Sequence, residues 1–438
     1  MKIIAKKNKI QQPLFFGQLF FNLGTFFLAS ALPISGIFYL FALSISFFKT
    51  KNIFKDKWNI GIIFISGLFI ANTLRFYLQE LNENLSYFQK SLALINLLNW
   101  VPLFCVFVLF QYYLKTSTQR KLFAKFLVGG SIPVIVTCFL QHFFQIYGPF
   151  KTMGGLIIFF NKAPIFDSGV TGLFSNQNYT GFWLSVTLPL IISLINKLKF
   201  NSIRIYITLT ILLFTIYFLI LTNSKNALVG FITSILVIFG FKKLIILFLI
   251  SFIFFQILNY LHFINPIWKL NLINHLKLND LINIMYLENI FNFLNFTRIK
   301  IWNITLQLIS QKPIFGFGAA TFPIIFFNFS NMKIQHAHNL PLHLAYEYGL
   351  PISILLSSFI IFLFYKSWSI IFNLKNKNLN YFFDKCWLAS CLVVIFSQIN
   401  DITYYDGKIS LLIWILFAGL KCILEDLNYK KLNLKEIT

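Results

Sequence analysis

Three of the six histidines in the chain, His336, His338 and His343, lie within eight residues in the segment KIQHAHNLPLHLAYEYG. An imidazole side chain titrates near neutral pH, so it can take a proton from a hydroxyl group or hydrogen-bond an anion. Such rings can also form an interfacial belt of polar aromatic residues at a membrane face. Six histidines among 438 residues would not be expected to place three within eight residues by chance, so this segment is the first candidate for chemistry.

The composition indicates that these side chains belong to a membrane protein. Of 438 residues, 58% are hydrophobic and 11% are charged, whereas soluble proteins have about 25% charged residues. The 37 Lys and Arg oppose 13 Asp and Glu, a net charge of +24, which usually raises the question of nucleic acid. Only four basic residues are arginine, and Lys, Asn, Ile and Phe are abundant together, so we discount the pI as evidence about partners. The five cysteines lie within or beside apolar runs and indicate neither a disulfide framework nor a zinc site.

The apolar stretches predict an all-α polytopic membrane protein, with residues 1–438 forming one integral membrane domain. A helix needs about 20 apolar residues to cross a bilayer. About twelve stretches meet this need: 14–31, 33–48, 58–77, 97–114, 122–146, 179–196, 203–221, 226–241, 244–260, 341–365, 386–400 and 409–424. Pro33 and Gly36 offer a break between the first two, which would otherwise form one bent helix and leave eleven spans. The opening MKIIAKKNKI is not expected to be a cleaved signal, because no small-residue cleavage site closes a short apolar core.

Charge distribution predicts the orientation. With the N-terminus inside, the cytoplasmic segments carry 25 of the 37 basic residues in short stretches, as the positive-inside rule requires. Both termini are therefore expected in the cytoplasm. Two outward connections are long enough to hold chemistry, 147–178 and the loop 261–340 between spans nine and ten. Within the larger loop, Ile299, Trp302, Leu306 and Ile309 recur at steps of three and four, which predicts an amphipathic helix over 297–310 that could lie in the membrane interface.

Four ordered motifs resemble one family. His338 and Asn339 are followed after nine residues by Gly349, with Glu347 two residues before it. The pattern resembles a signature of the O-antigen ligase and polymerase family of bacterial membrane glycosyltransferases. The other motifs that resemble this family are Gly172-x3-Asn176-x-Asn178, Ser224-Lys225-x-Ala227, and Arg298-x3-Trp302 followed by Pro313-x2-Gly316-x-Gly318.

Two departures from the family pattern accompany the resemblance. Lys225 stands where the family generally has arginine, and the second glycine expected after Gly349 is not in place. Lysine keeps the charge but loses the planar fork that grips phosphate with two hydrogen bonds.

The resemblance implies an inverting enzyme of the inner (plasma) membrane of bacteria. It implies a donor glycan on undecaprenyl diphosphate, whose diphosphate leaves with negative charge at the periplasmic face. Lys225 and Arg298 would meet this charge, although a lysine at a helix end also snorkels and an arginine on a helix can simply be solvated. With His338 they form the candidate catalytic set. The candidate substrate-binding set is Asn176, Asn178, His336, Asn339, Trp302 and Glu347.

Several roles stay open at this stage. His338 could be the base that takes a proton from the acceptor hydroxyl, or it could hydrogen-bond the diphosphate. Asn176 and Asn178 could orient sugar or phosphate, or cap a helix. Gly316 and Gly318 are better explained as turn formers than as a phosphate cradle. The exterior carboxylates are scattered, so we expect neither a metal nor another cofactor, as the resemblance also implies.

The acceptor also stays open. A ligase would transfer the glycan to lipid A core, a polymerase to a second lipid-linked glycan, and a protein O-oligosaccharyltransferase to Ser or Thr. Another class that fits twelve spans is a transporter of lipid-linked glycans. Against it, the two halves of the chain show no obvious repeat, and the polar motifs gather at the predicted outer face.

Overall fold

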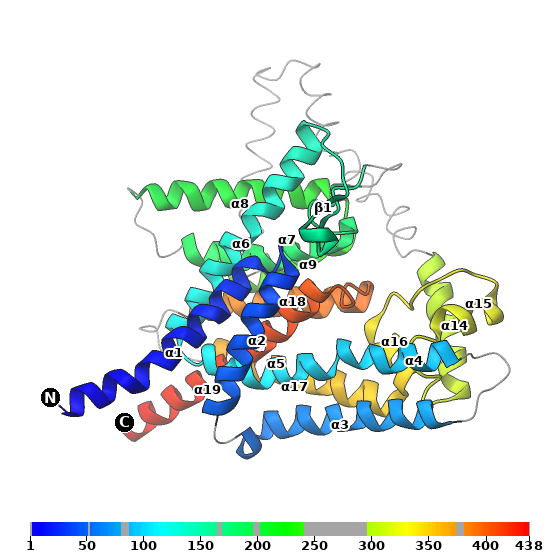
Figure 1. Cartoon of the computed structure of the whole chain (residues 1–438), viewed down its shortest axis with the longest axis horizontal. Helices are drawn as coiled ribbons and strands as arrows, with labels where there is room; N and C mark the ends of the chain where they lie inside the picture. The colour runs from blue at the N-terminus through cyan, green and yellow to red at the C-terminus, as the bar shows by residue number, and fades with distance from the viewer. Residues whose placement is uncertain are drawn as a thin grey trace.

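The computed structural model describes residues 2–50, 53–79, 87–163, 169–195, 202–240, 296–373 and 381–437. Apart from short 3-10 turns and one small hairpin, the described elements are α-helices, which confirms the predicted all-α class (Figure 1). The helices are α1 (Lys2–Phe27), α2 (Leu32–Lys49), α3 (Lys57–Leu78), α4 (Tyr87–Asn96), α5 (Val101–Phe110), α6 (Ser117–Phe143), α7 (Gln177–Ile195), α8 (Ile203–Leu221), α9 (Lys225–Phe239), α14 (Phe296–Gln311), α15 (Phe322–Ser330), α16 (Leu340–Tyr348), α17 (Leu350–Asn373), α18 (Phe382–Asn400) and α19 (Gly407–Ile437). In the hairpin, β1 (Phe150–Thr152) pairs antiparallel with β2 (Ile157–Phe159), with Lys151 opposite Ile158.

The membrane-spanning helices follow the apolar stretches closely. Within the described residues, nine helical segments are long and apolar enough to cross a membrane, and two shorter apolar helices, Phe15–Phe27 and Lys225–Phe239, occupy further predicted spans. The first apolar run is two helices, because α1 ends at Phe27 and Pro33 lies in the first turn of α2. The predicted span 244–260 lies outside the described residues.

The prediction of one span over 341–365 is wrong, because the chain breaks at Gly349. This glycine has a φ of +88° and ends α16, and a Cβ atom there would lie 2.0 Å from the carbonyl oxygen of Ile314. Only a residue without a Cβ fits this left-handed, crowded position. The N–H of Leu350 then donates to the carbonyl of Pro313 at 2.8 Å. The span is therefore α17, and α16 is a separate short helix before it.

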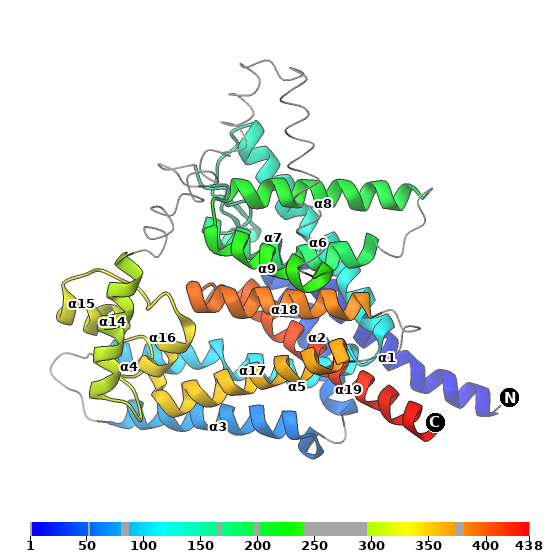
Figure 2. The same ribbon diagram turned by 180° about the vertical axis from the view of Figure 1, so that it is seen from behind.

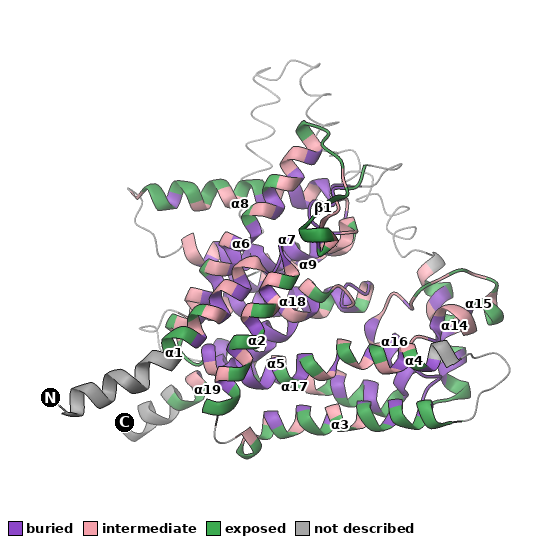
Figure 3. Ribbon diagram, viewed as in Figure 1, coloured by how far each residue is buried: buried purple, intermediate pink, exposed green. Residues whose placement is uncertain are grey.

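Helix α18 lies inside the bundle, packed against α7, α9 and α19. Figure 3 shows α7 and α18 mainly buried and the outer faces of α3 and α8 mainly exposed. Trp183, Trp387 and Trp414 are fully buried between the helices. The exposed residues on the outer helices include large apolar ones such as Phe64 and Leu213, which suits a surface that faces lipid.

The two ends of the bundle differ. Helix α1 begins and α19 ends at one end, and α14, α15 and α16 gather at the other (Figures 1 and 2). Both termini thus lie at the same end, as the charge pattern predicts, while their cytoplasmic orientation stays a prediction. At the end of the bundle that holds both termini, Arg120 of α6 forms an ion pair with Asp426 of α19, with 2.9 Å between Nη2 and Oδ2. This ion pair, in which Arg120 is buried and Asp426 is partly exposed, ties α6 to α19.

Candidate active site

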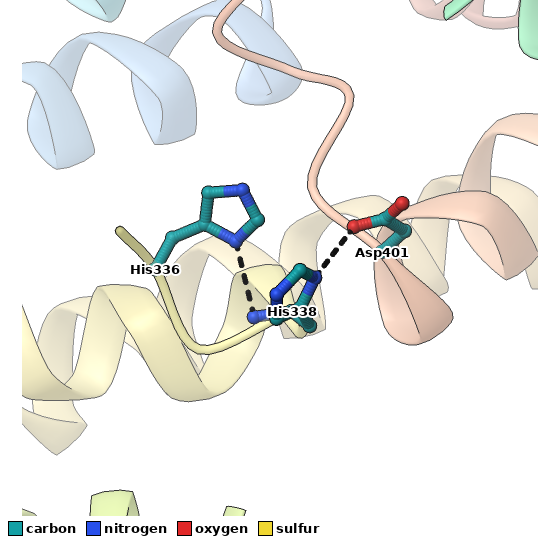
Figure 4. Close-up of side chains that lie close together, drawn as sticks. All are labelled: His336, His338 and Asp401. Carbon is teal, nitrogen blue, oxygen red and sulfur yellow. Dashed lines mark hydrogen bonds and ion pairs between the residues drawn. The ribbon is translucent and has the colours of Figure 1, made fainter. Parts of the chain in front are cut away.

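The centre of the candidate site is a contact between His338 and Asp401. His338 lies between α15 and α16, and its Nδ1 is 3.0 Å from Oδ1 of Asp401, which directly follows α18 (Figure 4). The carboxylate side chain is 8% exposed, whereas the imidazole is 30% exposed. When Nδ1 donates its proton to a carboxylate, Nε2 becomes the proton-accepting nitrogen of the ring. The pair therefore has the arrangement of an imidazole base and the carboxylate that orients it.

Neighbouring motif residues hold the backbone on both sides of His338. Asn339 accepts the N–H of Leu342 through Oδ1 at 2.9 Å and so caps α16, while its Nδ2 donates to the carbonyl of Ile399 at 2.9 Å. Trp302 donates its ring N–H to the carbonyl of Ala337 at 2.9 Å. His338 itself has a φ of +52°, a left-handed conformation that is uncommon outside glycine. These contacts fix the strained residue against α14 and the end of α18.

Asp401 is held by several donors besides His338. Nδ2 of Asn178, at the start of α7, donates to Oδ2 at 2.9 Å, and the N–H of Ile402 donates to Oδ1 at 2.9 Å. Burial alone would raise the pKa of this carboxyl. The hydrogen bond and charge of His338, together with the charge of Arg298, outweigh burial and lower the pKa. The carboxylate is therefore ionised at neutral pH.

Arg298 reaches the same place from the first turn of α14. Its Nη1 donates to the carbonyl of Asn400 at 2.5 Å, one residue before Asp401. A guanidinium has five N–H donors, so this bond leaves others for a ligand. The structure thus brings Arg298 next to the His338–Asp401 pair, as its place in the outer loop led us to expect.

The helix predicted over 297–310 is confirmed, but its predicted apolar face is buried only in part. Ile309 is buried, whereas Ile299 and Leu306 are 42% and 50% exposed. The rest of the buried face is formed by Ile301, Thr305 and Leu308. The reason is that α14 packs against α16 and α15 within the protein. This packing positions Arg298 and Trp302.

His336 stacks edge-on against His338, with ring centroids 4.4 Å apart, and its Nδ1 accepts the N–H of His338 at 3.3 Å. Burial and the neighbouring charges of His338 and His343 lower the pKa of His336 to about 4. His336 is therefore neutral at physiological pH.

Glu347 is buried rather than open to a ligand. Its Oε1 accepts the N–H of Ala320 at 2.9 Å, its Oε2 accepts the Tyr405 hydroxyl at 3.3 Å, and Nε2 of His343 lies 3.5 Å from Oε1. The carboxylate thus joins α16 to the loop after α18.

The glycine motif before α15 forms a turn, as predicted. Gly316 and Gly318 have positive φ angles of +68° and +96°. The N–H groups of Phe317 and Gly318 donate to the carbonyls of Tyr346 and Glu347 at 2.8 and 3.0 Å. The amides of this turn are thus engaged with the end of α16.

The remaining predicted residues lie on α7 and α9. Asn176 accepts the N–H of Asn178 at 2.8 Å and caps α7, so the cap interpretation is confirmed for Asn176, whereas the Asn178 side chain contacts Asp401. Lys225 is the exposed first residue of α9. The next residue, Asn226, donates to the carbonyl of Ser397 at 3.1 Å, one turn before Asp401. The start of α9 is thus fixed to the end of α18 that carries the site.

Two imidazoles and a carboxylate could also hold a metal. One ligand atom from each of His336, His338 and Asp401 lies within 4.8 Å of the others, and N and O donors of this kind suit several divalent transition metals. The positive charge of Arg298 acts on the same groups and opposes a cation there. Metal-independence stays a prediction that chelation can test.

Asp401 is the residue that the sequence analysis missed. It was counted among the scattered exterior carboxylates, because it lies 63 residues from His338 in sequence. The available signal was its position just after the predicted span 386–400, at the same predicted membrane face as His338.

Comparison with known families supports the motif assignment. Residues 210–357 match the family model described as O-Antigen ligase. The matched segment includes Lys225, Arg298 and His338, and Asp401 lies outside it. No curated protein sequence matches the chain. The match over residues 210–357 supports the resemblance of this part of the chain to the O-antigen ligase and polymerase family of membrane glycosyltransferases.

Proposed function

We propose that the protein transfers a glycan from an undecaprenyl-diphosphate carrier to an acceptor at the periplasmic face of the inner membrane, with lipid A core as the acceptor. The observation that carries the proposal is the contact between His338 and the buried Asp401 carboxylate at 3.0 Å, with Arg298 bound one residue away. A base beside a cation is what attack on a sugar diphosphate requires.

In the proposed reaction, Nε2 of His338 takes the proton of the acceptor hydroxyl. The hydroxyl oxygen attacks the anomeric carbon, and the bond from that carbon to the diphosphate oxygen breaks. A single displacement of this kind inverts the anomeric configuration. Asp401 keeps the imidazole oriented and stabilises the imidazolium that forms, in the manner of the carboxylate in a Ser-His-Asp triad.

The diphosphate leaves with a negative charge that needs cations. Arg298 offers the donors that its bond to Asn400 does not use. Lys225, at the start of a helix fixed to the same end of α18, would add a point charge. The positive end of the α9 dipole lies at Lys225 and favours an anion there.

The acceptor can be identified from glycolipids of a strain that lacks the protein. Polymer that stays lipid-linked and unattached to lipid A core supports the ligase. Accumulation of single lipid-linked repeat units supports a polymerase instead, and loss of glycans from Ser or Thr of proteins supports an O-oligosaccharyltransferase.

A reconstitution experiment separates an enzyme from a transporter. Purified protein with lipid-linked donor and acceptor should transfer the glycan, and the combined variant Lys225→Ala, Arg298→Ala, His338→Ala should not. Lys300→Ala is the matched control, because Lys300 is an exposed cation two residues after Arg298 on α14. If the triple variant keeps its transfer activity, the enzyme proposal is wrong. Transport failure alone, in liposomes, would favour the carrier.

A further inference from the structure

A polar cavity of about 400 Å³ lies at the end of the bundle that holds both termini, away from the candidate active site (Figure 1). It is bounded by the end of α2, the start of α3, the turn after α5 and the last membrane-spanning turns of α19. Ligand pockets typically have about 300–1,000 Å³, so the cavity has room for a small polar group. Its charged lining residues are Lys49, Asp56, Lys115, Lys421 and Glu425.

The floor of the cavity is an ion cluster in which two carboxylates share one ammonium group. Lys421 is 3% exposed, and its Nζ donates to Asp56 and, at 2.7 Å, to Oε1 of Glu425. Nζ also donates to Oε1 of Gln111 at 2.8 Å, so all three of its N–H donors are used. One ammonium cannot neutralise two ionised carboxylates. Because an uncompensated charge beside a membrane span is costly, the floor favours a second cation.

The rim of the cavity carries the opposite charge. Lys49, the last residue of α2, and Lys115, just after the turn that follows α5, both line the cavity and are exposed. The chain beside the rim is apolar, since Phe48 and Phe54 are 79% and 75% exposed, which suits contact with lipid. The cavity therefore leads from two cations at its mouth to an excess of negative charge at its floor.

We propose that this cavity binds the headgroup of an aminophospholipid, with the primary ammonium at Asp56 and Glu425 and the phosphate between Lys49 and Lys115. The ammonium of such a headgroup is the end farthest from the acyl chains, and the phosphate lies a few bonds away. The headgroup can thus enter ammonium first, while the acyl chains stay in the lipid beside Phe48. Lipid binding here does not depend on the proposed function.

The charges of the cavity favour this headgroup over two other membrane headgroups. A choline headgroup has a quaternary ammonium without N–H groups, so it cannot donate hydrogen bonds to Asp56 or Glu425. A glycerol headgroup has a phosphate for the two rim lysines but brings no cation to the floor. A primary ammonium brings three donors and a positive charge, and hydrogen bonds between charged partners are the strong ones.

A neighbouring cavity of about 460 Å³ provides a comparison within the same chain. It lies between α3, α17 and α19, and its lining includes one exposed cation, Lys366. None of the described residues that line it is acidic. This second cavity therefore offers a partner for a phosphate but none for an ammonium group.

The test uses the full chain, purified in detergent and depleted of lipid. Phosphatidylethanolamine, phosphatidylcholine and phosphatidylglycerol with the same short acyl chains are added separately, and binding is measured as the rise in the thermal unfolding midpoint. Phosphatidylethanolamine should give the half-maximal rise at a concentration about tenfold lower than the other two lipids, because only its headgroup pairs with both charged regions.

Variants locate the binding. Glu425→Gln removes the excess negative charge and should raise the half-maximal concentration of phosphatidylethanolamine about tenfold. The double variant Lys49→Gln, Lys115→Gln should do the same, and its exposed positions keep the test valid if Glu425→Gln does not fold. Lys366→Gln is the matched control, because it removes an exposed lysine from the neighbouring cavity, and it should leave the response unchanged.

Three results would overturn the proposal. Equal responses to the three lipids would mean that the headgroup is not recognised, and a preference for phosphatidylglycerol would assign the cavity to an anionic lipid. An equal response to free phosphoethanolamine would assign it to a soluble ligand. An unchanged response to phosphatidylethanolamine in both the Glu425 variant and the double lysine variant would place the lipid elsewhere on the protein.

Discussion

Replacing Asp401 by asparagine removes one charge from the site and almost no volume. The carboxylate faces an imidazolium only when His338 has taken the acceptor proton, so the lost attraction falls on the transition state. Two unit charges 3.0 Å apart attract by about 5 kcal/mol at an effective dielectric constant of about 20. Solvent reaches the partly exposed imidazole and screens the pair, so we take about half of this, about 2–3 kcal/mol. Since 1.36 kcal/mol is about tenfold in rate, kcat should fall about 30- to 150-fold.

The assay is the initial rate of glycan transfer by purified protein with lipid-linked donor. The KM for the donor should change little, because the carboxylate contacts the base. Asp406→Asn is the matched control, because Asp406 accepts the N–H groups of Lys408 and Ile409 at the start of α19, and asparagine caps helices about as well as aspartate. A kcat for Asp401→Asn within threefold of the unsubstituted protein would refute the role given to the pair.

Three other changes test the structure around the site. Gly349→Ala should destabilise the protein by more than about 2 kcal/mol, because the left-handed conformation alone costs about 1–2 kcal/mol and the new Cβ would meet Ile314; the measurement is the thermal unfolding midpoint in detergent, which should fall. Gly67→Ala, where a Cβ meets nothing within 4 Å, should not lower the midpoint, and equal midpoints for the two variants would contradict the backbone break. The pKa of His336 is lowered to about 4, so between about pH 6.5 and pH 4 the unfolded chain binds a proton that the folded chain does not, and stability falls as the pH falls. His336→Gln should therefore lose less stability between pH 7 and pH 5 than the unsubstituted protein, and an identical loss would count against the lowered pKa. Treatment with EDTA followed by gel filtration should leave the transfer rate unchanged, whereas a loss restored by a divalent metal would assign the two histidines and the carboxylate of the site as ligands.

The spans could be predicted because bilayer thickness acts on length and composition alone. The motif residues could be placed at one end of the bundle because alternate connections between spans lie at the same membrane face, and the distribution of basic residues indicates which face that is. The break at Gly349 had a signal that hydropathy does not measure. Pro351 follows it in the first turn of α17, where proline often begins a helix.

The buried face of α14 could not be predicted from its periodicity. The helix has apolar residues at two sets of helical spacing, one through Ile299 and Leu306 and one through Ile301 and Leu308. Both satisfy the same rule, and tertiary packing buries the second set together with Ile309 of the first. The contact between His338 and Asp401 could not be predicted from the sequence either, because it also depends on tertiary packing. It requires the ends of α14, α16 and α18 to meet.

The spacing of the His-Asn-x9-Gly pattern has a physical reason in this structure. Asn339 begins α16 and Gly349 ends it, so the nine residues between them are the helix itself. At its start, Asn339 fixes His338 beside α18, and at its end Gly349 allows the close approach of Ile314. One inserted residue would turn these ends by about 100° relative to each other. Glu347, on the buried side of the same helix, ties it to Ala320 and Tyr405. The motif therefore specifies a helix of fixed length that holds the base against its carboxylate, and most of its residues serve that position.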